Sequence, residues 1–129
     1  MLPEFTALEN VAMPALILGK KYLDVKEQAL EHLRSVGLEN RASHKPPMLS
    51  GGEQQRVAVA RALMNSPKVI LADEPSGNLD TTNAQMLHEL IWNLSREKGY
   101  TFVIVTHNEA LAKEADKMAR IVDGVVQSK

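Results

Sequence analysis

Two acidic residues and a histidine stand where the strands of a sheet are expected to end. Asp73 and Glu74 follow the apolar run at residues 69–72, and His107 follows residues 101–106. Short apolar runs bounded by turn residues are typical of strands buried on both faces of a parallel sheet. Open parallel sheets bind ligands beyond the carboxyl ends of their strands. The three side chains are therefore candidates for one common site.

Paired carboxylates at such a position suit the attack of water on a phosphate. Asp73 can hold Mg²⁺ through water while Glu74 polarises the attacking water, or the two can exchange these roles. Structural alternatives stay open. Acidic residues often end strands or cap the next helix, and a lone histidine such as His107 is commonly a partly buried polar residue with a local hydrogen bond.

A serine and two glycines stand at the start of an expected helix. Glycines let the backbone approach an anion closely, and a helix N-terminus presents free N–H groups and partial positive charge. Ser50 adds a hydroxyl donor before Gly51 and Gly52. Ser50 and Glu53 also fit a capping box. The same four residues could therefore be only a helix cap and a turn.

The wider string from Leu49 to Gln54, LSGGEQ, resembles the signature sequence of ABC ATPases. The resemblance implies an ATP-binding role for Ser50, Gly51, Gly52 and Glu53. It also implies that these residues bind the γ-phosphate of an ATP held mainly by a second ATPase subunit, so that two subunits meet head to tail.

Further motifs of that family match the strand ends and the loop between them. Asp73 matches the Walker B aspartate that supports Mg²⁺, and Glu74 matches the catalytic base beside it. Residues 76–80 match the D-loop, whose Asp80 packs across the dimer interface and helps to place the water. Asp80 could otherwise simply cap the next helix. His107 matches the switch histidine, which is expected to touch the γ-phosphate and orient the water.

This family binds ATP mainly through a Gly-rich loop that ends in Gly-Lys-Ser/Thr, and the sequence contains no such loop. The pair Gly19-Lys20 is followed by Lys21 rather than by a hydroxyl residue. The glutamine loop and the aromatic residue that stacks on adenine are missing as well. We therefore expect the full-length subunit to hydrolyse ATP with Mg²⁺, and this chain alone to bind little ATP and to be inactive.

The expected fold is α/β, a partial P-loop NTPase core with a parallel sheet and part of the α-helical subdomain, without the Walker A strand and loop. Residues 1–48 are assigned to the helical subdomain and residues 49–129 to the ATPase core. Capping, periodicity and turn residues predict helices at 7–12, 25–36, 54–64, 82–97 and 108–118, strands at 69–72 and 101–105, a loop at 39–48, and an Asp-Gly hairpin at 121–126. Thr6 and Glu9 fit a capping box at the start of the first helix, and Asn108 is expected to cap the last one. Gly37 and Gly99 are expected to end the second and fourth helices, Gly37 in a left-handed turn.

The family sheet places its Walker A strand between the strand that ends at His107 and the one near Ile121. Without that strand, we expect either altered pairing across the gap or exposed apolar edges that drive self-association.

Composition excludes several classes of protein. The chain has 129 residues, 44% of them hydrophobic and 24% charged, which fits one globular domain. A net charge of −1 without basic clusters makes nucleic acid an unexpected partner. The absence of cysteine excludes disulfides and thiolate metal sites. No apolar stretch approaches the roughly 20 residues of a spanning helix, and no secretion signal is present, so we expect a cytoplasmic location.

Three segments, residues 4–14, 38–46 and 72–80, are similar to the ATPases that drive lipoprotein release from the bacterial inner membrane. This similarity implies transmembrane permease subunits as partners, contacted through residues 4–48, and a peripheral position on the cytoplasmic face of that membrane. ATPases of macrolide export and cell division share the D-loop sequence and stay alternatives. Non-transport ABC ATPases share the signature sequence and are a further alternative, although neither the coiled-coil insertion of repair ATPases nor the basic cluster of ribosome-binding ones is present.

Overall fold

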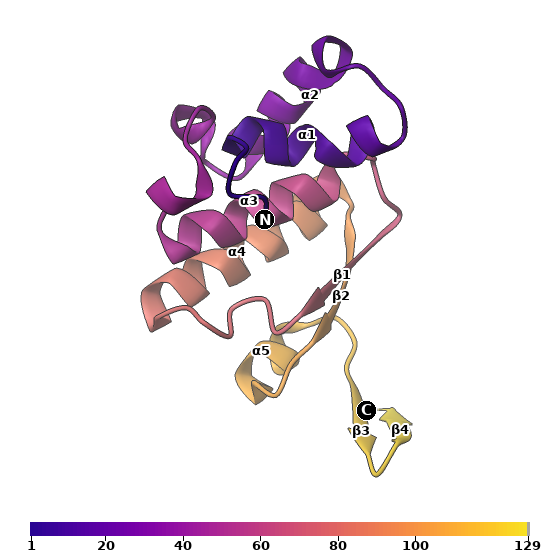
Figure 1. The fold of residues 1–129 in the computed structure, drawn as a ribbon. Helices are drawn as coiled ribbons and strands as arrows, with labels where there is room; N and C mark the ends of the chain where they lie inside the picture. Colours follow the sequence, from indigo (N-terminus) through magenta and orange to yellow (C-terminus); the bar gives the residue numbers. More distant parts are fainter. Residues whose placement is uncertain (129) are drawn as a thin grey trace.

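Three helices pack against one another in the first half of the chain (Figure 1). The computed structural model describes residues 1–128. Its first three helices are α1 (Ala7–Ile17), α2 (Tyr22–Ser35) and α3 (Gly51–Leu63). Their facing side chains form one buried cluster, which we call the helical core and which includes Ala7, Val11, Ala15, Ala29, Leu33, Val57 and Ala60.

Helix α1 runs further than the sequence predicts. Its start is as expected, because Thr6 and Glu9 form the predicted capping box. The prediction that it ends near residue 12 is wrong, since the helix continues through Pro14 to Ile17. Proline cannot donate the helical hydrogen bond and costs about 3 kcal/mol in a helix interior. The side chains of Val11, Ala12 and Ala15 on both sides of the proline are buried in the helical core, and this packing of the whole helix offsets the cost.

Helix α2 begins at Tyr22 rather than at Val25, and Gly37, with φ of 78°, ends this segment in the predicted left-handed conformation. The expected loop at residues 39–48 contains two short 3₁₀ turns, η1 (Glu39–Arg41) and η2 (Pro46–Met48). This loop leads directly into α3.

A parallel pair of strands follows, joined by a helical crossover. Strand β1 (Val69–Asp73) pairs with β2 (Thr101–Val105) in a register that sets Asp73 beside Val105. Helix α4 (Thr81–Lys98) connects them and ends at the left-handed Gly99. The predicted strand-helix-strand unit is confirmed.

The prediction that these strands are buried on both faces is wrong. Ile70 is 6% exposed and packs with Leu63 of α3 and Leu94 of α4. Its neighbour Leu71, on the opposite face, is 77% exposed, and Val105 is 60% exposed. Within residues 1–128, helices cover one face of the pair, so alternate side chains stay in solvent.

The last elements are α5 (Glu109–Glu114) and a hairpin of β3 (Ala119–Val122) and β4 (Val125–Ser128). Helix α5 ends before the predicted residue 118. Asp123 and Gly124 both have positive φ, as the predicted tight turn requires. Among residues 1–128 the hairpin forms a sheet separate from β1 and β2, and Figure 1 shows it apart from the helices. None of the helices described is long and apolar enough to cross a membrane.

Candidate functional site

The carboxyl ends of β1 and β2 bring Glu74 and the segment around His107 together. The backbone N–H of Glu74 donates to the carbonyl of Val105 at 2.7 Å. Its carboxylate accepts from the Thr106 hydroxyl at 3.1 Å and from the backbone N–H of His107 at 2.5 Å. We call Asp73, Glu74, Thr106 and His107 the strand-end cluster. The Glu74 carboxylate is held by two contacts, and its backbone by a third, all to one neighbouring strand end.

Glu74 also has an unusual backbone conformation. Its φ of 45° lies in the left-handed region, which costs a non-glycine residue on the order of 1–3 kcal/mol. The carbonyl of Glu74 accepts from the N–H of Gly77 at 3.0 Å, which closes a turn directly after the strand. The hydrogen bonds to Val105, Thr106 and His107 hold this conformation. Strain of this kind is concentrated at functional sites.

The other members of the strand-end cluster are open to solvent. Asp73 and His107 are both exposed, whereas Glu74 is partly buried. Asn108, directly after the histidine, caps α5 as predicted, because its side chain accepts from the N–H of Leu111 at 3.2 Å. Its own N–H donates to the Thr106 hydroxyl at 3.0 Å. The segment that carries His107 is therefore fixed on both sides.

The start of α3 is a complete capping box. The hydroxyl of Ser50 accepts from the N–H of Glu53 at 3.1 Å, and the Glu53 carboxylate accepts from the N–H of Ser50 at 2.9 Å. Ser50 and Gly51 are exposed and Gly52 is buried; we call these three residues the signature turn. The Ser50 hydroxyl can still donate its proton, so the capping role and an anion-binding role are compatible.

Glu53 is held by the chain itself. One carboxylate oxygen accepts from Ser50, and the other lies 3.3 Å from Nε of Arg41. The hydrogen bond from the Ser50 backbone, assisted by its hydroxyl and by Arg41, holds the pKa of Glu53 below its ordinary value. A carboxylate has no donor to offer a phosphate. In this structure Glu53 fixes the shape of the signature turn.

The signature turn lies away from the strand-end cluster. Figure 1 shows the start of α3 beside the start of α4, and the loop before α4 leads back from there to the end of β1. Leu79, in that loop, approaches Gly51, since a Cβ added to the glycine would lie 3.7 Å from Leu79 Cδ2. One chain thus presents the two predicted groups of site residues at separate places, joined by residues 76–80.

Comparison with known proteins identifies the family. The sequence model described as ABC transporter matches residues 1–77. The chain belongs to the ABC transporter family. It is 59% identical over 127 residues to the lipoprotein-releasing system ATP-binding protein LolD of Bacteroides thetaiotaomicron and 57% identical over 126 residues to LolD of Geobacter metallireducens. These matches cover 98% of the chain and 58% and 56% of the relatives, so the chain spans little more than half of their length.

Solved structures of ABC cassettes confirm the predicted fold. A dimeric, post-hydrolysis structure of the ATP-binding cassette MJ0796 with ADP and Pi has a TM-score of 0.78 at 40% identity, covering 99% of the chain and 58% of that protein. The ADP conformation of the cassette MJ1267 has a TM-score of 0.85 at 27% identity, covering 97% and 54%. The chain is therefore a partial P-loop NTPase core of the ABC ATPase type.

Sequence reasoning missed residues that support this ABC fold around its site. His88 received no role, yet it is 7% exposed and its Nε2 lies 2.7 Å from the hydroxyl of Ser76, the first residue of the D-loop. In the sequence, His88 lies between the apolar residues Leu87 and Ile91, which are buried in α4, and this position could have indicated that His88 is buried as well. Thr106 was also missed, because only its contact with Glu74 gives it a role.

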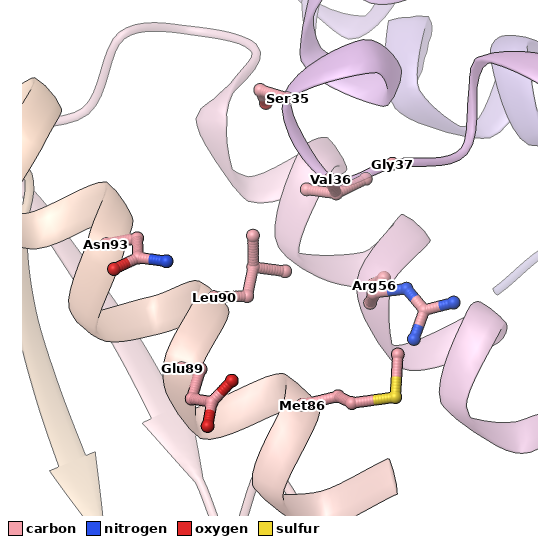
Figure 2. A pocket seen from close by; sticks show the side chains of 8 residues that line it. All are labelled: Ser35, Val36, Gly37, Arg56, Met86, Glu89, Leu90 and Asn93. Carbon is pink, nitrogen blue, oxygen red and sulfur yellow. The ribbon is translucent and has the colours of Figure 1, made fainter.

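A groove of about 390 Å³ lies at a different place, between the end of α2, α3 and α4 (Figure 2). Val36 and Arg56 face Met86 and Leu90 across it. None of the predicted site residues lines this groove, so it is separate from the ABC motifs.

Proposed function

We propose that this protein works as the ATP-hydrolysing subunit of an ABC transporter, with Glu74 as the base that activates water. The observation that carries the proposal is the fixed Glu74 carboxylate at the ends of two parallel strands. Glu74 takes a proton from water as the water oxygen attacks the γ-phosphorus, and the bond from that phosphorus to the leaving ADP oxygen breaks. His107, at the same edge, orients the water and the phosphate.

Asp73 supplies the protein's support for Mg²⁺ in this proposal. It is an exposed carboxylate at the end of β1, next to Glu74. Among residues 1–128 no group of three His, Cys, Asp or Glu side chains is arranged to hold a metal. Mg²⁺ is usually bound through one or two carboxylates, several waters and the phosphates of its substrate, so a single exposed carboxylate suits this role.

A second ATPase subunit completes the site. Ser50 and Gly51 are exposed at the N-terminus of a 13-residue helix, away from the strand-end cluster of the same chain. Such a helix end suits a phosphate, and a position away from the chain's own cluster suits a phosphate held by a partner. The structures of MJ0796, which are dimeric, support a pair of subunits. In the head-to-tail pair that the motifs imply, Ser50, Gly51 and Gly52 bind the partner's ATP and Asp80 packs at the interface.

Lipoprotein release from the bacterial inner membrane is the transport process that the relatives support. Four relatives between 55% and 60% identical are lipoprotein-releasing system ATP-binding proteins. In this role the subunit lies on the cytoplasmic face of the membrane and binds permease subunits there. The exposed side chains of Ile17 at the end of α1, of Leu18 directly after it and of Leu23 in α2 offer an apolar surface for that contact.

Glu74→Gln tests the proposal. The chain is joined to the unmatched part of the B. thetaiotaomicron LolD sequence, and phosphate release from ATP and Mg²⁺ is measured. Loss of the base should lower turnover by about 10²–10⁴-fold. Glu109→Gln is a matched control, because Glu109 is an exposed carboxylate of α5 near Arg120. Unchanged turnover in Glu74→Gln would remove Glu74 as the base.

A further inference from the structure

Gly52 is enclosed by its own chain. It is buried, whereas Ser50 and Gly51 beside it are exposed. A Cβ added to Gly52 would lie 2.5 Å from Oδ1 and 2.9 Å from Cγ of Asn83, distances at which something must move. A Cβ added to Gly51 would meet Leu79 at an ordinary 3.7 Å. The second glycine of the signature turn is thus confined from within the chain.

Asn83 is itself held in place by the end of the D-loop. Its side-chain amide donates to Oδ1 of Asp80 at 3.0 Å, and its backbone N–H donates to the same oxygen at 2.8 Å. Asp80 is the N-cap of α4. With Nδ2 directed to Asp80, the amide oxygen lies over Gly52. Asp80, Asn83 and Gly52 therefore form a continuous packed contact between the starts of α4 and α3.

We propose that Asn83 is a positioning residue that locks the signature turn to the D-loop within one chain. The inference rests on the proposed function, in which the signature turn contacts an ATP held by the partner and the D-loop packs at the dimer interface. The D-loop leads back to Glu74 through Ser76, which His88 holds at its other end. Through this lock the signature turn and the D-loop move as one unit. A shift of the signature turn on binding the partner's ATP therefore also shifts the D-loop and, through it, the chain's own strand-end cluster.

Thermal unfolding of the chain itself tests the contact. The set comprises the parent, Gly52→Ala, Asn83→Ala and the double variant. Gly52→Ala should lower Tm by roughly 5–10 °C, because the added methyl overpacks against Asn83. In the Asn83→Ala background the same substitution should lower Tm by less than about 2 °C, since the amide is gone and alanine favours a helix more than glycine does.

Gly51, the exposed glycine beside Gly52, provides the control for this experiment. Gly51→Ala should change Tm little and by the same amount in both backgrounds, because its methyl has ordinary room. An equal drop for Gly52→Ala with and without Asn83 would overturn the lock. If Gly52→Ala does not fold, recovery of folding in the double variant becomes the measurement, and no recovery overturns the proposal.

Cooperativity of ATP hydrolysis tests the functional part. In the joined protein that contains the whole ATPase domain, the parent should have a Hill coefficient for ATP well above one, with two as the limit for two sites. Asn83→Ala should bring it close to one, whereas simple loss of folded protein would lower turnover and leave it unchanged. A parent value of one, or an unchanged value in Asn83→Ala, overturns the coupling. Turnover that does not depend on Glu74 would instead refute the proposed function and leave the unfolding result standing.

Discussion

The helical core and the strand pair differ in how they bury similar side chains. Leu33 of α2 and Val57 of α3 are completely buried, whereas Leu71 of β1 and Val105 of β2 are 77% and 60% exposed. Both regions are rich in aliphatic residues. Three helices supply one another with apolar faces, but a two-stranded sheet has two faces and α3 and α4 cover one of them. Burial therefore follows from what covers a face as much as from its residues.

The difference extends to the site. The signature turn is part of a helix that contributes to the helical core, and a side-chain lock supports it. The strand-end cluster lies on the half-covered strands. Its geometry depends on the hydrogen bonds that Glu74 accepts from Thr106 and His107. The signature turn is positioned by core packing as well as by its capping hydrogen bonds, whereas the strand-end cluster is positioned by polar contacts.

Truncation of one leucine in each region should give the largest contrast. Leu33→Ala should lower the free energy of unfolding by about 3–5 kcal/mol, because it leaves a cavity in the helical core. Leu71→Ala, the matched variant on the open face of β1, should change it by less than about 0.5 kcal/mol. Urea unfolding followed by circular dichroism measures both, at protein concentrations well below those at which we expect the chain to self-associate. A loss of several kcal/mol for Leu71→Ala would show that a partner covers this face in solution.

Self-association tests the open face directly, and its expected effect is intermediate. Leu71, Val103 and Val105 are exposed side by side on β1 and β2, next to strand edges that can pair with another chain. We predict that the chain forms dimers or larger species at tens of micromolar in sedimentation velocity. Leu71→Lys should raise the dissociation constant about tenfold or more, because it removes burial of a leucine worth at least 1.4 kcal/mol.

Leu23→Lys is the control for that experiment. Leu23 is 84% exposed but belongs to α2, on the helical side of the molecule. The substitution should leave self-association unchanged. A parent chain that sediments as a monomer at these concentrations would contradict the prediction, and equal weakening by both variants would place the contact elsewhere.

Local signals predicted most of the elements. The capping boxes at Thr6 and Ser50 and the left-handed glycines at 37 and 99 depend on neighbouring residues, and each is present. The meeting of Glu74 with the His107 segment was also predictable, because parallel strands that are adjacent end at one edge. Residues that are neighbours in the sequence do not determine tertiary packing. Tertiary packing allows α1 to continue past Pro14 and leaves one face of each apolar strand exposed.

The supporting contacts of the site were beyond sequence reasoning for the same reason. Nothing near Gly52 in the sequence indicates that Asn83 lies over it, 31 positions later. From the sequence, His88 is only a polar residue within a helix, and its hydrogen bond to Ser76 is found in the structure alone. The motifs predicted which residues we propose to face the nucleotide. The residues that hold the motifs are identified by contacts between elements, which only the folded chain supplies.

The smallest effect that we predict is a pH dependence confined to the helical side. Partial burial, and then the positive charge of Lys98, lower the pKa of His32 in α2 below its ordinary value of 6.5, although Glu31 opposes this. Its Nε2 is buried without a hydrogen-bond partner among residues 1–128. The unfolded chain therefore binds the proton more readily. Stability is complete above pH 6.5 and falls as the pH drops from there through the folded pKa.

His32→Gln removes this titration and should flatten the fall in Tm between pH 7.5 and 5.5. The change should be smaller than that from Leu33→Ala, because His32 is only partly buried. Leu33→Ala is the control, because it lowers stability in the same helix without removing a titratable group, and it should leave the fall in Tm with pH as it is in the parent. If His32→Gln leaves this fall as steep as in the parent, the partial burial of His32 is not its cause, and the helical side loses its predicted dependence on pH.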